Sequence, residues 1–311
     1  MTSPTQISPQ DAAAAPEANR ATDTVADTAA DPDLLVTGGW LLPTGAPGLA
    51  GFTAKFESVL ARLQATLTAA DPSGSPGPSW YPPVVPRAQI DRAEYTEGFP
   101  QLLGVIHAPP PADSGPAGAD SMPSEPEPTE TVLAPAVCYS VYPRLADRVL
   151  ERANRFDIAG HCYRHEATSE PGRLRSFRMR EFVLVGGEQQ AAQFRDSWIP
   201  HCEKLFTDLG LPFTVQAASD PFFGPGARFL RSSQMQQRLK YEFVVPVHAA
   251  DPGTAVASAN CHKDHLGQRF AIGWASGGTA HSACIAFGLE RIVLALIHAH
   301  GDRLEDWPVL G

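Results

Sequence analysis

The segment Cys162–Phe182, CYRHEATSEPGRLRSFRMREF, gathers arginines and acids around one Pro-Gly turn. Because residues two apart on a strand share a face, we expect Arg164 and Glu166 to project side by side. A guanidinium in this position can bind a phosphate, and the carboxylate can accept a hydrogen bond from an exocyclic amine. The pattern predicts a nucleotide site. The alternative is a surface hairpin with ordinary ion pairs.

More arginines follow in the loop and the returning strand: Arg173, Arg175, Arg178 and Arg180. Such a cluster suits a polyphosphate. The strand continues with Glu181 and Phe182, and an aromatic ring there can stack on a base. Adjacent residues on a regular strand face opposite sides, so both can serve one site only if the strand twists or begins there.

A second cationic position is the tetrapeptide GLER, Gly288 to Arg291, which precedes an apolar helical pattern. Gly288 permits close approach of the backbone, and Arg291 in the first helical turn can lie over a base or reach a phosphate. An arginine near a helix N-terminus opposes the helix dipole, so an anionic ligand would favour its presence.

Short strand-like segments make up most of the remaining chain. Apolar periodicity predicts helices over 49–70, 191–209 and 289–300 and a shorter basic helix that ends near Gln237. Strands are expected at 101–108, 131–143, 213–218, 240–247, 254–260, 270–277 and 281–287. Many strands, short turns and few helices indicate an α+β fold whose sheet is mostly antiparallel and flanked by helices.

The formal net charge of -10 is concentrated in two segments. Residues 1–36 and 109–131 are acidic, rich in small residues and proline, and poor in large apolar side chains. We therefore expect a disordered acidic tail over 1–36 and a flexible acidic insertion over 109–131, with one folded domain over 37–311. The rest of the chain is balanced in charge, which neither supports nor excludes a polyanionic partner.

The chain lacks the apolar run of a signal peptide or a membrane span. Its five cysteines are scattered and form no Cys-x-x-Cys pair, which indicates a reduced cytoplasm. We interpret Cys162 and Cys202 as structural.

The motifs together carry a family resemblance. RHE…REF resembles motif 2 of class II aminoacyl-tRNA synthetases, ACIAFGLERIVLAL resembles motif 3, and the 49–70 helix with WYPPVVP is similar to motif 1, which implies a homodimer. KYEF and SANCHKDHLGQRF are similar to segments of seryl-tRNA synthetases. Through GHCYRHEATSEPGRLRSFRMREFVLVG, DPFFG and TAHSACIAFGLERIVLAL, the chain most resembles the amino acid:[carrier protein] ligases, relatives of atypical zinc-dependent seryl-tRNA synthetases.

This resemblance covers about residues 37–311 and implies the class II catalytic-core fold. It implies that ATP activates a small amino acid, glycine or alanine, as an aminoacyl-adenylate, which is then transferred to the phosphopantetheine thiol of a carrier protein. Arg164 would hold the α-phosphate and Glu166 the adenine amino group, while Phe182 and Arg291 would sandwich the ring. Arg173 is a candidate for the outer phosphates.

The same resemblance implies a Zn²⁺ site at Cys138, Glu181 and Cys284, each expected on a strand or at a strand start. Two thiolates and one carboxylate would leave a position at which the substrate amino group displaces a water. The alternative is that both cysteines are simply buried thiols. The segment CHKDH, 261–265, is a rival metal site by composition, although its ligands are too close in sequence to converge easily from a strand.

Magnesium is expected to bridge the phosphate oxygens of ATP. Seryl-tRNA synthetases usually carry a metal-binding glutamate just before the SNC-like segment. This chain reads AVASANC there, with Val256 near that place, which leaves the magnesium ligands open.

A basic segment, Gly224–Lys240, is the candidate for carrier binding through Arg228, Arg231, Arg238 and Lys240, and a solvated basic helix is the alternative. A seryl-type tRNA synthetase and a non-catalytic paralogue are the competing functions. No tRNA is expected, because residues 1–36 cannot form an RNA-binding coiled coil and no segment follows Gly311. The joint presence of Arg164, Glu166 and Arg291 argues against a degraded paralogue.

Overall fold

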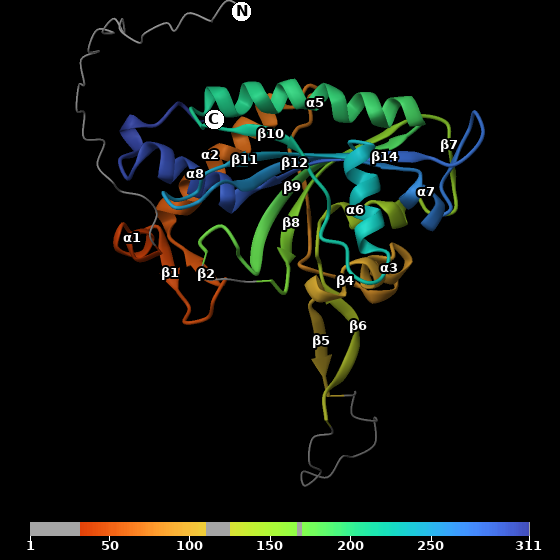
Figure 1. The fold of residues 1–311 in the computed structure, drawn as a ribbon, viewed down its shortest axis with the longest axis horizontal. Helices are drawn as coiled ribbons and strands as arrows, with labels where there is room; N and C mark the ends of the chain where they lie inside the picture. The colour runs from red at the N-terminus through yellow and green to blue at the C-terminus, as the bar shows by residue number, and fades with distance from the viewer. Residues whose placement is uncertain (1–31, 110–124, 167–169, 311) are drawn as a thin grey trace, which may run out of the picture.

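The computed structural model describes residues 32–109, 125–166 and 170–310. Its centre is a seven-stranded sheet in the order β10-β11-β12-β14-β9-β8-β3 (Figure 1). All neighbouring strands are antiparallel except β3, which runs parallel to β8 at one edge. The strands span β3 Ser79–Tyr81, β8 Asn154–Tyr163, β9 Ser176–Gly186, β10 Thr214–Ala217, β11 Lys240–Val245, β12 Thr254–Lys263 and β14 His281–Gly288. The predicted α+β class with a mostly antiparallel sheet is confirmed.

Three long helices cover one face of this sheet: α2 Ala54–Ala70, α5 Glu188–Asp208 and α8 Leu289–His300. Helix α2 begins after Thr53, whose hydroxyl accepts the backbone N–H of Phe56 at 3.4 Å. Its apolar residues repeat at helical spacing and are buried in the core shared with α5 and α8. These helices therefore fix the sheet from one side and leave its other face for a site.

Smaller elements surround the sheet. The β5–β6 hairpin projects away from the body (Figure 1). Helix α6 lies on the side of the sheet away from α5. The remaining bounds are α1 Pro32–Thr37, β1 Leu41–Pro43, β2 Ala50–Phe52, β4 Val84–Pro86, α3 Arg87–Arg92, α4 Tyr95–Gly98, β5 Val105–Ala108, β6 Glu127–Leu133, β7 Val149–Leu150, α6 Ala227–Gln236, α7 His265–Arg269 and β13 Gly273–Trp274, with 3-10 turns η1 Pro100–Leu102, η2 Cys138–Ser140, η3 Tyr142–Arg144 and η4 Leu304–Asp306.

Strand β9 divides two hydrophobic cores by simple alternation. Met179, Val183 and Val185 face the core formed with η2, η3 and α7, whereas Phe182 and Leu184 face the core under the helices. The pairing of β9 with β8 and with β14 is regular along its whole length. Successive side chains of β9 therefore point to opposite sides of the sheet without exception.

Several local expectations need correction. Residues 32–36 of the expected tail lie in α1, and residues 127–131 of the expected insertion lie in β6, paired with β5. The parts of the expected tail and insertion at 1–31 and 110–124 lie outside the described residues. Cys138 begins a 3-10 turn and not a strand, and the strand expected at 270–277 shrinks to two residues after α7. Among the described residues, no helix has both the length and the apolar composition needed to span a membrane.

Candidate active site

A large cavity of about 1460 Å³ opens on the sheet face opposite α2, α5 and α8. Strands β9, β11, β12 and β14 form its floor, and α4, α6 and the 219–226 loop contribute to its walls. Arg164, Glu166, Arg173 and Arg291 all line this one cavity. The structure therefore brings together the residues expected at the two nucleotide motifs, although Arg291 lies more than 100 positions from the other three in the chain.

The cavity concentrates positive charge. Arg291 is fixed by donating from Nε to the Gly172 carbonyl at 2.7 Å and from Nη1 to the Ala255 carbonyl at 2.8 Å. Burial, together with the neighbouring charges of Arg164 and Arg173, lowers the pKa of Arg291 to about 10. An anion bound between these guanidinium groups would offset their repulsion, which is the electrostatic arrangement that a polyphosphate requires.

Phe182 does not belong to this cavity, which corrects its expected role in stacking. Its ring is buried on the helical side of the sheet and packs 4.6 Å, centroid to centroid, from that of Trp198. Phe177 lies on the same face of β9 as Glu181, and the guanidinium of Arg164 lies 5.4 Å from its ring centroid. Its separation of four from Glu181 was the signal in the sequence, because an even spacing on a strand preserves the face.

Arg178 and Arg180 were expected to contribute to polyphosphate binding and also lie on the opposite face. Arg180 is fully buried and donates from Nε and Nη2 to the carboxylate of Asp157 at 2.9 and 2.7 Å. Its Nη1 donates to the Gln64 carbonyl of α2 at 2.6 Å. Arg178 pairs with Glu57 of α2 and Glu290 of α8. Both arginines therefore connect the sheet to its helices, and only Arg173 of the loop cluster reaches the cavity beside Arg164.

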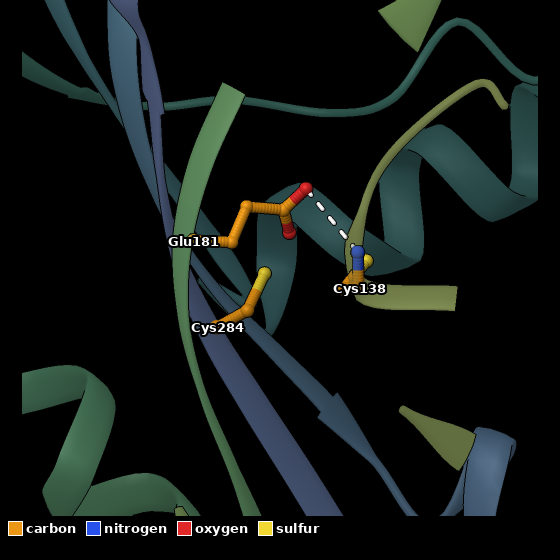
Figure 2. A group of neighbouring side chains, drawn as sticks. All are labelled: Cys138, Glu181 and Cys284. Carbon is orange, nitrogen blue, oxygen red and sulfur yellow. Dashed lines mark hydrogen bonds between the residues drawn. The ribbon is translucent and has the colours of Figure 1, made fainter. Parts of the chain in front are cut away.

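Cys138, Glu181 and Cys284 meet at the cavity floor. One ligand atom from each lies within 4.8 Å of the other two, and all three residues are buried. Glu181 and Cys284 extend from neighbouring strands toward Cys138 on η2 (Figure 2). The Glu181 carboxylate accepts the backbone N–H of Val137 at 2.8 Å and that of Cys138 at 3.3 Å, which fixes its position.

The surroundings of this group favour a cation. Burial, and then the negative charge of the nearby Cys284 thiolate, raises the pKa of Glu181 to about 7. The hydrogen bond with Cys138, aided by His262, holds the pKa of Cys284 below its ordinary range. Two sulfur atoms and one carboxylate are a donor set that Zn²⁺ accepts, with a fourth position free. The residues present therefore fit a zinc ion.

The rival segment CHKDH does not form a second cluster. Cys138, Glu181 and Cys284 are the one group of three metal-ligating residues found in the described part of the chain. His262 instead reaches Cys284 with Nε2 at 3.6 Å from Sγ, and Asn260 approaches the same sulfur with Nδ2 at 3.4 Å. The sequence pattern gave no indication of these two contacts.

The other expected residues divide between core and cavity. Cys162 and Cys202 are fully buried in the two cores. Val256 is buried on the helical side. Lys240 was expected at a carrier surface, but its ammonium is largely buried and pairs with Asp220 at 2.7 Å and with Glu242 at 3.0 Å.

Comparison with known proteins identifies the fold. The tRNA synthetase class II core domain (G, H, P, S and T) matches residues 125–300. M. kandleri SerRS, solved in complex with A. aeolicus tRNASec, superposes with a TM-score of 0.73 at 19% identity, covering 94% of this chain and 60% of that one. The Pyrococcus horikoshii seryl-tRNA synthetase complexed with ATP superposes with a TM-score of 0.61 at 15% identity, covering 86% of this chain and 58% of that one.

Proteins with similar sequences indicate the family to which the chain belongs within the class II fold. The "Amino acid--[acyl-carrier-protein] ligase 1" of Bradyrhizobium diazoefficiens is 38% identical over 85% of this chain and 83% of its own. The "Type-2 serine--tRNA ligase" of Methanopyrus kandleri is 29% identical over 57% of this chain and 36% of its own. The chain therefore has the class II tRNA synthetase core and belongs to the amino acid--[acyl-carrier-protein] ligases, a family of enzymes.

Proposed function

We propose that this enzyme uses ATP to convert glycine or alanine into an aminoacyl-adenylate and transfers the aminoacyl group to the phosphopantetheine thiol of a carrier protein. The observation that carries this proposal is the shared cavity, which holds three arginines beside the buried group Cys138–Glu181–Cys284. The name of the Bradyrhizobium relatives supports a carrier protein as the acceptor of the aminoacyl group. The choice of a small amino acid rests on the resemblance noted in the sequence.

In the first step, a carboxylate oxygen of the amino acid attacks the α-phosphorus of ATP, and the bond to the pyrophosphate oxygen breaks. Arg164 stabilises the charge on the α-phosphate, and Arg173 binds the outer phosphates. Glu166 accepts a hydrogen bond from the adenine amino group. Phe177, in place of Phe182, and Arg291 enclose the ring. Class II synthetases use ATP with Mg²⁺, which neutralises the phosphate oxygens.

Cys138, Glu181 and Cys284 hold Zn²⁺ in this proposal. Zinc would supply a Lewis acid that binds the amino group of the substrate and so selects amino acids with a free amine.

In the second step, the phosphopantetheine sulfur attacks the carbonyl carbon of the adenylate. The bond to the phosphate oxygen breaks, and AMP leaves.

Helix α6 and the loop before it form the proposed carrier surface. Phe223, Phe229, Leu230 and Met235 are exposed there, beside the exposed Arg228. Apolar residues with a basic rim fit an acidic carrier helix and its phosphopantetheine phosphate. The loop and Leu230 also line the cavity, so a carrier bound at this surface would have a short path for its thiol.

We further propose that the enzyme is a cytoplasmic homodimer through its motif 1 elements and does not charge tRNA. The competing function is a seryl-type tRNA synthetase, which is favoured by the similarity to the Methanopyrus kandleri serine--tRNA ligase. Both functions share the adenylation step, so only the acceptor separates them.

Amino-acid-dependent exchange of pyrophosphate into ATP, screened over all twenty amino acids, tests the first step. We expect exchange with glycine or alanine. A zinc-replete, folded protein that exchanges with none of them would contradict the ligase and favour a non-catalytic paralogue. Loading of phosphopantetheinylated carrier against loading of tRNA then identifies the acceptor, and tRNA loading alone would support the seryl-type alternative.

A further inference from the structure

Strand β12 contains an irregularity beside the metal-ligand group. Cys261 pairs with Ala283, but the next partner, Ser282, pairs with Lys263, so His262 is an extra residue in the ladder. Lys263 has φ of 54°, in the left-handed region that residues other than glycine rarely adopt. Such a bulge redirects a side chain, and backbone strain of this kind gathers at functional sites. Here the redirected side chain is His262, whose Nε2 lies 3.6 Å from Cys284 Sγ.

The other ring nitrogen of His262 faces two buried hydroxyl groups. Nδ1 lies 3.1 Å from Ser282 Oγ and 3.3 Å from the Tyr142 hydroxyl. Tyr142 donates its one hydroxyl hydrogen to Ser282 Oγ at 3.1 Å. The hydrogen of Ser282 can then be donated to Nδ1. With Nδ1 as acceptor, a neutral ring carries its proton on Nε2, the nitrogen that faces the sulfur.

We propose that His262 is a positioning residue for the metal-ligand group: held as its Nε2–H tautomer by Ser282 and Tyr142, it donates a hydrogen bond to Cys284 Sγ and keeps the thiolate directed at the metal. This inference rests on the proposed zinc site. A buried thiolate without a donor is costly, and partners behind a metal ligand commonly fix its orientation. Tyr142 and Ser282 are 0% and 1% exposed, so water does not compete for this chain of hydrogen bonds.

Zinc affinity measured by chelator competition tests the role of His262 in the full-length protein. We expect His262→Leu to lower the affinity by about 10- to 100-fold. His262→Gln, whose amide nitrogen can still donate toward the sulfur, should retain most of it. His265→Leu is the matched control, because this histidine lies in the same segment and contacts Glu94, not Cys284. It should bind zinc as the natural protein does.

Two spectroscopic measurements separate positioning from a general structural effect. In the Co²⁺-substituted protein, the sulfur-to-metal charge-transfer band should change in His262→Leu and be restored in His262→Gln. In the Zn²⁺ protein, nitrogen NMR of the His262 ring should show the proton on Nε2. Ser282→Ala combined with Tyr142→Phe removes both hydroxyl donors near Nδ1. It should allow the proton to occupy either nitrogen, and it keeps the test available if His262→Leu does not fold.

The possible failures are distinguishable. A natural protein that binds no metal would overturn both the zinc site and the role of His262. A metal-bound natural protein with unchanged affinity and Co²⁺ spectrum in folded His262→Leu would overturn only the role of His262. A ring without a proton on Nε2 would also overturn it, since the nitrogen would then be free to bind the metal directly.

Discussion

Arg178 holds the Glu290 carboxylate by two hydrogen bonds, from its Nε to Oε1 at 2.6 Å and from its backbone N–H to Oε2 at 2.7 Å. Glu290 is 1% exposed and stands in the first turn of α8, directly before Arg291. The same guanidinium donates from Nη1 and Nη2 to Glu57 of α2, both at 2.8 Å. One arginine thus ties the strand of the first nucleotide motif to the helix that carries the second.

Removing the buried partner of Arg178 should therefore affect both stability and ATP binding. We expect Glu290→Ala to lower the free energy of unfolding by about 3 kcal/mol, because a buried charge loses its partner. It should also raise the KM for ATP through displacement of Arg291. Glu57→Ala removes the more exposed partner of the same arginine and should cost less than about 1 kcal/mol. Urea unfolding measures both values, and equal losses would contradict the dominant role of Glu290.

Loss of the metal should abolish amino acid activation while leaving the fold in place. We expect a chelator or Cys284→Ser to remove zinc and amino-acid-dependent exchange, with zinc restoring only the chelated natural protein. Metal binding should also stabilise the fold by about 2.7 kcal/mol at a zinc concentration 100-fold above Kd. Cys202→Ala is the control, because this buried cysteine lies in the core on the other side of the sheet. Full exchange by a metal-free protein would contradict the site.

The sequence was sufficient to predict which residues belong to the candidate site, apart from the face of the strand on which each residue lies. Arg164, Glu166 and Arg291 line one cavity, as the family resemblance implied, although Arg291 lies more than 100 positions from the other two. Phe182 was misplaced because the returning strand was not known to be regular. Its regular pairing with two neighbours puts every second residue under the helices.

Other features depended on tertiary contacts that no local pattern contains. Lys240 was expected to be an exposed surface charge, yet the fold places Asp220 beside it and buries the pair. In the sequence, His262 is one residue of a polar segment. The bulge in β12, which the sequence does not reveal, turns its side chain toward Cys284. The expected helix over 49–70 ends at Ala70 as α2 does, because its apolar periodicity is sustained over several turns. Helix α2 begins only at Ala54, because Ala50–Phe52 form β2, which pairs with β1.

The two phenylalanines of β9 should differ in what they affect. We expect Phe177→Leu to raise the KM for ATP by about tenfold, since an aromatic ring under a base contributes about 1–3 kcal/mol. Phe182→Leu should lower stability by about 1 kcal/mol and leave the KM for ATP unchanged, because this ring packs against Trp198. Exchange kinetics and thermal unfolding on both variants provide the comparison. An unchanged KM in Phe177→Leu would remove this residue from the adenine site.

Asp220 should make the fold sensitive to acid. Burial alone would raise its pKa, but Lys240 and the amide of Gln234 outweigh this and hold the pKa below its ordinary value near 3.8. A depressed folded-state pKa means that the stabilisation is complete above the unfolded pKa and is lost as the pH falls through the folded value. The free energy of unfolding should therefore fall below about pH 4, and less steeply in Asp220→Asn. Glu305→Gln, at an exposed position, should keep the natural acid dependence.

Charge reversal on α6 should separate carrier recognition from adenylation. Arg228 is exposed beside Phe229, whose side chain is 75% exposed, so a carrier bound here would contact both. We expect Arg228→Glu to lower kcat/KM for carrier loading by about tenfold, or about 1.4 kcal/mol, with amino-acid-dependent exchange unchanged. The exposed Arg303, which pairs with Asp306 after α8, supplies the matched reversal Arg303→Glu and should leave both reactions intact. Because a defect in folding would slow exchange as well, only selective loss of loading supports the α6 surface. Equal loading by the two reversals would place the carrier elsewhere on the protein.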